Sequence, residues 1–289
     1  MLTSYGWGLF AAIPFSEGAL AAFLYGAHRR RDLGQSIAVA MCAMLLTLGG
    51  LLAVALEGAI CIAMAAPLAL FLAFIGALFG HVVTNSGPRL RVNAGFLLVL
   101  TLLSPAIMGA EAVVPRDTPT YMVQSQIVID APPMQVWNRV ISFPDLPPPT
   151  EPTFRLGIAY PERAKIVGRG VGAVRYCEFS TGDFVEPITV WEPGKRLAFR
   201  VARNPEPMRE LSVYPALDTP HLHGYMVSRN GEFDLEALPG GRTLLIGRTW
   251  YQHHLWPGTY WAIFSDRIIH QIHMRVLRQI KQLSESKGK

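Results

Sequence analysis

Histidines in the second half of the sequence are the first side chains to consider for chemistry. They form three pairs, which are His221 and His223, His253 and His254, and His270 and His273. A spacing of three residues on a helix places two imidazoles at neighbouring positions, where both could bind one metal ion. No cysteine or carboxylate completes a known ligand spacing, and the motif His-Glu-x-x-His is absent. We therefore expect no metal site and no cofactor.

Other polar side chains could act as general acids or bases. The candidates are Tyr176, Glu178, Arg248, Tyr251 and His270. A catalytic group must lie within hydrogen-bond distance of the substrate, so it must face inward. Strand alternation places Tyr176 with Glu178 on one face, and Arg248 with Trp250 on one face of another strand, but leaves open which face is concave. The motifs of serine hydrolases and phosphate-binding loops are absent, so catalysis and simple ligand binding both stay open.

The composition of the chain changes near residue 115. The 289 residues include 26 basic and 21 acidic side chains, but residues 1–115 contain only five arginines, no lysine and four acids. The first part is therefore lipid-like in composition, and the second part has the charge of an ordinary soluble domain. The net charge of +5 forms no extended basic run, so we expect no nucleic-acid partner.

Four apolar segments fill the first part. They cover residues 6–27, 36–56, 59–83 and 94–113. About 20 apolar residues are needed to cross the roughly 30 Å hydrocarbon core of a bilayer as a helix. The sequence thus predicts a membrane domain of four transmembrane helices at residues 1–114, a linker at 115–120 and a second domain at 121–289.

Arginines between these segments predict the orientation. Three arginines occupy residues 29–31 in the first connection, and Arg89 and Arg91 lie in the third. Because cytoplasmic loops are enriched in arginine and lysine, we expect a multi-pass protein of the cytoplasmic (inner) membrane whose second domain is extracytoplasmic. Pro14 and Glu17 interrupt the first segment, which leaves open whether it crosses fully. Glu17 is either a functional group at membrane depth or an interfacial one.

The second domain begins at residues 123–143 with an alternating strand, a proline turn and a helix that contains Trp137. Further strands are predicted at residues 165–168, 172–180, 183–191, 196–201, 224–238 and 242–253. A long amphipathic helix over residues 259–284 ends the chain. The predicted fold class is α+β, in which a curved antiparallel sheet wraps around this helix. An apolar cavity between sheet and helix would then be the binding site.

Several segments of the second domain carry a family resemblance. They are residues 127–132 with Val136 and Trp137, residues 170–175, residues 191–197, residues 240–243 and the final helix. With them, residues 121–285 resemble the START-like, or SRPBCC, superfamily, which includes the polyketide cyclase/dehydrase and lipid-transport group. The resemblance implies a helix-grip fold with a deep hydrophobic pocket between the sheet and the last helix. The proline-rich residues 204–223 depart from a minimal member, and we interpret them as a lid or a partner surface. The four-helix half resembles no family.

The pocket implied by this resemblance supports three hypotheses for function. Its candidate lining residues are Trp137, Tyr176, Glu178, Arg248, Trp250, Tyr251, Trp261, Phe264, Ile268 and Ile272. The favoured hypothesis is a membrane-tethered protein that binds a hydrophobic small molecule or lipid. The second is a cyclase- or dehydratase-like enzyme that acts on a membrane-soluble substrate. The third is an assembly or accessory subunit that binds another membrane protein.

Overall fold

The computed structural model describes residues 5–85, 94–114, 118–212, 214, 219 and 222–286. Arg89, Arg91, His221 and residues 115–117 of the predicted linker lie outside the described residues. The chain divides into two compact units. The first consists of residues 1–117, 210–220 and 255–259, and the second of residues 118–209, 221–254 and 260–289.

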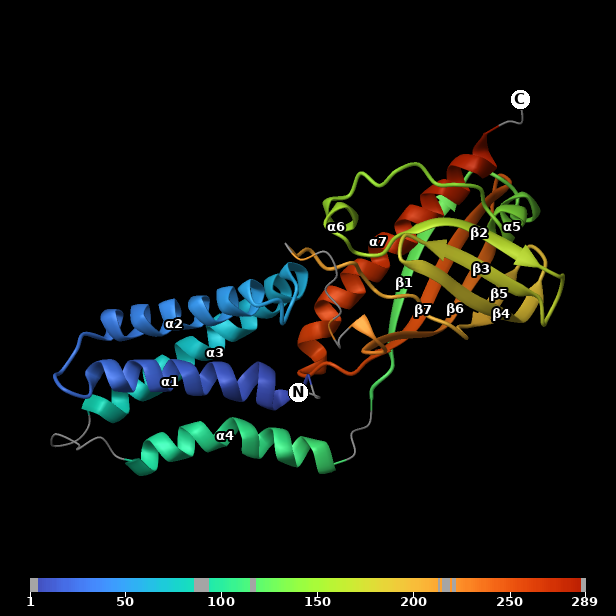
Figure 1. The fold of residues 1–289 in the computed structure, drawn as a ribbon. Helices are drawn as coiled ribbons and strands as arrows, with labels where there is room; N and C mark the ends of the chain where they lie inside the picture. Colours follow the sequence, from blue (N-terminus) through green and yellow to red (C-terminus); the bar gives the residue numbers. More distant parts are fainter. Residues whose placement is uncertain are drawn as a thin grey trace. The chain divides into compact units, whose positions relative to one another are not determined.

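Apolar helices make up most of the first unit (Figure 1). They are η1 (Gly8–Ala12), which continues into α1 (Ile13–Gly26), then α2 (Leu33–Ala53), α3 (Ala59–Asn85) and α4 (Ala94–Val113). Within the described residues, four helical segments are long and apolar enough to cross a membrane. The four predicted apolar helices are thereby confirmed, and they indicate association with a membrane.

Helices α1 and α3 approach each other closely at small residues. A Cβ atom on Gly18 would lie 2.0 Å from the carbonyl oxygen of Ala73, and one on Gly76 would lie 2.1 Å from that of Phe15. Neither position can therefore hold a side chain without moving the backbone of the facing helix. Close contact of this kind is typical of helix packing in membranes, where dispersion forces replace the hydrophobic effect.

Two short segments from the carboxyl-terminal half of the sequence belong to the first unit. The Glu210 carboxylate accepts hydrogen bonds from the backbone N–H groups of Ile60 (3.0 Å) and Cys61 (3.1 Å) in the first turn of α3. The Trp256 backbone N–H donates to the carbonyl oxygen of Tyr5 (3.0 Å). The N–H groups of a first helical turn have no partner inside the helix, and Glu210 supplies both an acceptor and a favourable charge.

The second unit contains one curved antiparallel sheet (Figure 1). Its described elements are β1 (Tyr121–Ile129), α5 (Pro133–Ile141), α6 (Pro152–Arg155), β2 (Pro161–Val167), β3 (Val174–Phe179), β4 (Gly182–Glu192), β5 (Arg196–Arg200), β6 (Met226–Leu238), β7 (Arg242–His253) and α7 (Gly258–Glu285). The seven described strands are arranged in the order β1-β7-β6-β5-β4-β3-β2. Hairpins connect most neighbours, and β1 closes against β7 because the first and last strands pair in antiparallel register.

Helix α7 packs along the sheet, as the amphipathic pattern predicts (Figure 1). Leu277 and Ile280 on its distal half are fully buried against Leu197 and Leu245 of the sheet. Trp137 and its neighbours on α5 close the same core. Burial of an aliphatic side chain of this size contributes about 1.5–3 kcal/mol, so this cluster anchors the helix. The predicted α+β helix-grip architecture is confirmed.

Candidate functional site

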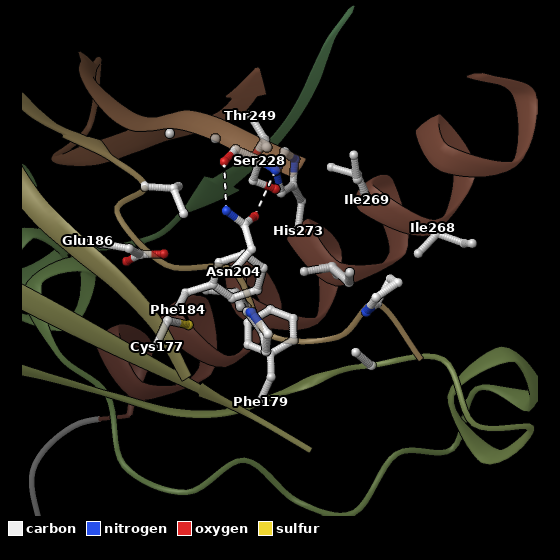
Figure 2. Close-up of a pocket in the computed structure, with 18 of the residues that line it drawn as sticks. Cys177, Phe179, Phe184, Glu186, Asn204, Ser228, Thr249, Ile268, Ile269 and His273 are labelled. Carbon is white, nitrogen blue, oxygen red and sulfur yellow. Dashed lines mark hydrogen bonds between the residues drawn. The ribbon is translucent and has the colours of Figure 1, made fainter. Parts of the chain in front are cut away.

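A cavity of about 140 Å³ lies between the sheet and the middle of α7. Its walls come from β3 to β7, from the turns of α7 around Ile268 and Ile272, and from the loop of residues 204–208 (Figure 2). Apolar cavities of similar volume hold a molecule the size of benzene. Val276 and Leu277 of α7 both line the cavity and belong to the core cluster beyond it, so the cavity borders that core.

Two glycines border this space on the inner face of the sheet. Gly231 of β6 and Gly247 of β7 line the cavity at positions where neighbouring strands carry large side chains. A Cβ atom on Gly231 would lie 2.5 Å from the ring of Phe199, so that ring occupies the volume a side chain would need. A Cβ atom on Gly247 would make ordinary contact with Phe233, at 3.6 Å, and a longer side chain there would project into the cavity.

Phenylalanine rings form much of the apolar wall. Phe179 of β3 and Phe184 of β4 meet edge to face with ring centroids 4.8 Å apart, and Phe199 lies 6.4 Å from Phe233. Figure 2 shows Phe179 and Phe184 pointing into the cavity. Aromatic pairs in these tilted arrangements are favourable and leave ring faces or edges available to a ligand. The wall therefore suits a flat or ring-containing apolar molecule.

A buried ion pair stands within this apolar wall. Arg175 and Glu186 face each other in the register of β3 and β4, and Nη1 of Arg175 donates a hydrogen bond to Oε2 of Glu186. Their side chains are only 2% and 7% exposed. Burial raises the pKa of the Glu186 carboxyl more than the attraction of Arg175 lowers it. The Arg175 guanidinium also lies 5.6 Å and 5.7 Å from the ring centroids of Phe199 and Phe233, within cation–π distance.

Cys177 follows Arg175 on the same face of β3. Burial raises the pKa of its thiol to about 12, so the side chain stays a neutral thiol at physiological pH. A thiol is a poor nucleophile and a poor metal ligand compared with a thiolate. Within the described residues, no three histidine, cysteine or acidic side chains gather closely enough to hold a metal ion.

The loop of residues 204–208 is fixed to the sheet by a paired hydrogen bond. Nδ2 of Asn204 donates to the carbonyl oxygen of Ser228 (3.2 Å), and the Ser228 N–H donates to Oδ1 of Asn204 (2.8 Å) (Figure 2). The amide thus replaces a neighbouring strand at this edge of the cavity. The predicted excursion at residues 204–223 therefore divides, because residues 204–208 line the cavity and residues 210–220 belong to the first unit.

His273 brings an imidazole to the cavity wall. Its Nε2 lies 2.7 Å from the hydroxyl of Thr249 on β7, and its Nδ1 lies 3.1 Å from the hydroxyl of Ser125 on β1. The Ser125 hydroxyl is also 2.7 Å from Nδ1 of His270. Burial, with a smaller contribution from His270, lowers the pKa of His273 to about 4, so this imidazole is neutral at physiological pH.

Three of the predicted pocket residues border the cavity. Ile268 and Ile272 contribute side chains from α7. Arg248 lies at the wall, but its guanidinium bonds Gln124 (2.7 Å) and Glu232 (2.6 Å). Because Thr249 points to α7, alternation directs the Arg248 side chain to the opposite, convex face.

The strand residues Tyr176, Glu178 and Trp250 are not among the cavity-lining residues. The inner face of β3 is formed by Arg175 and its alternate neighbours, so Tyr176 and Glu178 fall on the convex face. There the Glu178 carboxylate pairs with Arg163 and Lys165 of β2. Trp250 shares the convex face of β7 with Arg248 by the same alternation.

The aromatic candidates Trp137, Tyr251, Trp261 and Phe264 pack elsewhere in the second unit. Trp137 meets Trp191 edge to face in the distal core. Tyr251 is fully buried and donates its hydroxyl hydrogen bond to Asp266 (2.6 Å). Trp261 and Phe264 join an aromatic cluster near the start of α7. These rings stabilise the fold on either side of the cavity.

Several lining residues were missed by sequence reasoning, notably Arg175, Glu186, Asn204 and His273. The predicted hairpin turn at residues 181–182 lies one residue earlier, because Phe179 pairs with Gly182. With that register, Arg175 faces Glu186, and the pairing of opposite charges on adjacent strands would have been visible.

The helix-grip architecture and its cavity define a class of ligand-binding domain, and comparison with known proteins finds a family that this domain is similar to. Residues 121–252 match the model of the family described as polyketide cyclase / dehydrase and lipid transport. The match covers part of residues 121–285, which resemble the START-like (SRPBCC) superfamily. No curated protein sequence matches the chain.

Similar solved structures cover the second half of the chain. Norcoclaurine synthase from Thalictrum flavum, in complex with dopamine and hydroxybenzaldehyde, is 14% identical, with a TM-score of 0.39, over 61% of this chain and 97% of that one. The Zhui aromatase/cyclase from Streptomyces sp. R1128 is 14% identical, with a TM-score of 0.34, over 58% and 94%. A protein from Nitrosospira multiformis is 19% identical, with a TM-score of 0.38, over 57% and 97%. Similarity at this level does not define a ligand.

Proposed function

We propose that this protein is a membrane-tethered binding protein for a hydrophobic small molecule or lipid, which it holds between the sheet and α7. The observation that carries the proposal is the cavity itself, which Gly231 and Gly247 line from the inner face of the sheet. Concave, mostly apolar sites with a few buried polar groups are typical of small-molecule binding. The family of residues 121–252 and the apolar helices support the same proposal.

The lining residues narrow the class of ligand. Phenylalanines favour an apolar body, and the Arg175–Glu186 pair contributes no net charge to the cavity. A ligand with its own full charge would lose hydration without gaining a free counter-ion. A neutral molecule with one or two hydroxyl or carbonyl groups fits this lining best.

Filling the cavity tests the proposal. We expect native mass spectrometry of the full chain, released from mild detergent, to detect a bound small molecule. Ile268→Trp adds an indole to the cavity wall and should abolish its retention, and Gly247→Val should do the same from the sheet side. Ile263→Trp is the matched control on the same helix, because Ile263 is 65% exposed and should leave retention unchanged.

A wild-type protein that carries no small molecule, or an Ile268→Trp variant that retains it as wild type does, would contradict the proposal. The Gly247→Val variant keeps the test decisive if Ile268→Trp disturbs folding. Thermal unfolding of each variant in detergent shows whether the fold is intact before retention is compared.

We also propose that the second unit lies outside the cytoplasmic membrane. The arginines at residues 29–31, with Arg89 and Arg91, support this orientation through the positive-inside rule. A periplasmically active alkaline phosphatase fused after Lys289 should be active, whereas a fluorescent protein that folds only in the cytoplasm should be dark at the same position. Bright cytoplasmic fluorescence would reverse the proposed orientation.

A further inference from the structure

Four side chains form a continuous hydrogen-bonded chain beside the cavity. Thr249 bonds His273 (2.7 Å), His273 bonds Ser125 (3.1 Å), and Ser125 bonds His270 (2.7 Å). They come from three elements, β1, β7 and α7, that only the folded sheet and helix bring together. Every distance is within the range of a normal hydrogen bond.

The two ends of this hydrogen-bonded chain, Thr249 and His270, lie in different environments. Thr249 and His273 line the cavity, where Figure 2 shows both side chains at its wall. Ser125 is buried, and His270 is exposed to solvent on α7. The chain therefore runs from the interior of the binding site to the surface of the second unit.

The chemistry of the four groups allows the chain to be polarised in either direction. Ser125 has one hydroxyl proton and bonds two Nδ1 atoms, so it donates to one imidazole and accepts from the other. If it donates to His270, then His273 donates to Ser125 and accepts the Thr249 proton on Nε2. If it donates to His273, then His270 donates to Ser125, and Nε2 of His273 donates to Thr249, whose own proton is free to face the cavity.

We propose that Thr249, His273, Ser125 and His270 form a proton-transfer chain that gives the cavity an acid–base function toward a hydroxyl or carbonyl group of the bound molecule. The proposal rests on the proposed function in one respect, since it takes the cavity as the ligand site. Thr249 contacts the ligand, and the two histidines and Ser125 act through it as positioning and relay residues.

When a proton leaves the ligand, each of the four side chains can pass on one proton as it receives another. A hydroxyl group of the ligand gives its proton to Oγ1 of Thr249, and the Thr249 proton passes to Nε2 of His273. The Nδ1 proton of His273 passes to Ser125, and the Ser125 proton passes to Nδ1 of His270. The ligand becomes an oxyanion and His270 an imidazolium, which solvent then deprotonates. The reverse sequence protonates a ligand oxygen.

The surroundings of His273 suit a relay rather than a permanent charge. Of the elements packed against it, β1 and β7 present the hydroxyls of Ser125 and Thr249, and the charge that acts on His273 in the described structure comes from His270 on its own helix. Burial keeps the His273 imidazole neutral. Protonation of His273 and of His270 at once is disfavoured, so the excess proton is directed to the exposed end.

Hydrogen exchange of the His273 ring proton tests the proposed proton-transfer chain without any ligand. The full chain would be labelled with ¹⁵N-histidine, and exchange with solvent measured by NMR in detergent micelles. In wild type, the ring proton should exchange quickly despite burial. Ser125→Ala and His270→Gln should both slow exchange. Ser265→Ala, a buried serine of α7 outside the chain, is the control that should match wild type.

The direction in which Ser125→Ala changes the exchange rate distinguishes a proton relay from a structural role. If Ser125 only stabilised the packing of α7, its removal would loosen the site and speed exchange. Exchange in Ser125→Ala that equals or exceeds the wild-type rate would therefore overturn the proposal. Because the measurement needs no ligand, its failure is distinguishable from failure of the binding proposal, which native mass spectrometry decides separately.

Discussion

The Arg175–Glu186 pair places two opposite charges inside an apolar wall. Removing both ions from water costs several kcal/mol each, and their attraction offsets this only when the geometry is good and other polar atoms are satisfied. Nε of Arg175 has no hydrogen-bond partner among the described residues. The pair thus contributes little net stability and keeps a polar group available within the binding site.

Removal of one partner of the pair should lower the free energy of unfolding more than replacement of both partners. Arg175→Met leaves the Glu186 carboxylate buried and unpaired, and we expect it to lower the free energy of unfolding by about 3–5 kcal/mol. The double variant Arg175→Met/Glu186→Leu should recover most of this loss because no charge stays buried. Urea unfolding of the full chain in detergent, followed by tryptophan fluorescence, measures both. A double variant no more stable than Arg175→Met would contradict this account.

His273 should make stability depend on pH. Its folded pKa of about 4 lies below the ordinary histidine value of about 6.5. Between these values the unfolded chain binds a proton that the folded chain does not, so stability is complete above pH 6.5 and falls as the pH falls toward 4. The loss should reach about 3 kcal/mol. Relative to wild type, His273→Gln should flatten the unfolding free energy over this window, and parallel curves would refute the assignment.

The helices and strands were easier to predict from the sequence than the contacts between them. The amphipathic pattern of residues 259–284 anticipates α7 (Gly258–Glu285) almost to its ends, and hydropathy anticipates the four apolar helices. Strand alternation separates Arg175 from Tyr176, but only tertiary packing decides which of them faces α7. The local signals place side chains on faces, whereas the concave face and the register depend on contacts between distant segments.

The first turn of α3 is capped by the side chain of Glu210, which is distant in the sequence. Glu210→Ala removes the carboxylate that accepts from Ile60 and Cys61, and we expect a loss of about 1 kcal/mol of unfolding free energy. Thermal unfolding in detergent, compared with wild type, measures the loss as a lower melting temperature. Glu236→Ala, which removes an exposed carboxylate from β6, is the matched control. Equal melting temperatures for the two variants would exclude a capping role.

At the scale of the whole molecule, apolar helices and a domain with an internal cavity occur in one chain. The helices indicate membrane association, and residues 121–252 match the family model described as polyketide cyclase / dehydrase and lipid transport. The composition change near residue 115 predicts this pairing from sequence. It does not predict that residues 210–220 and 255–259 belong to the first unit, because short polar and aromatic segments carry no hydropathy signal for the unit they join.

Because residues 210–220 and 255–259 belong to the first unit, that unit cannot be completed before most of the second unit is synthesised. Helix α4 ends at Val113, but the first unit is complete only when residue 259 has left the ribosome. At about 5–20 residues per second, the interval is roughly 7 to 30 s. During the first part of it, the first turn of α3 lacks Glu210, and until nearly its end the backbone of Tyr5 lacks Trp256. The helical unit must therefore persist as an unfinished intermediate while most of the binding domain is translated.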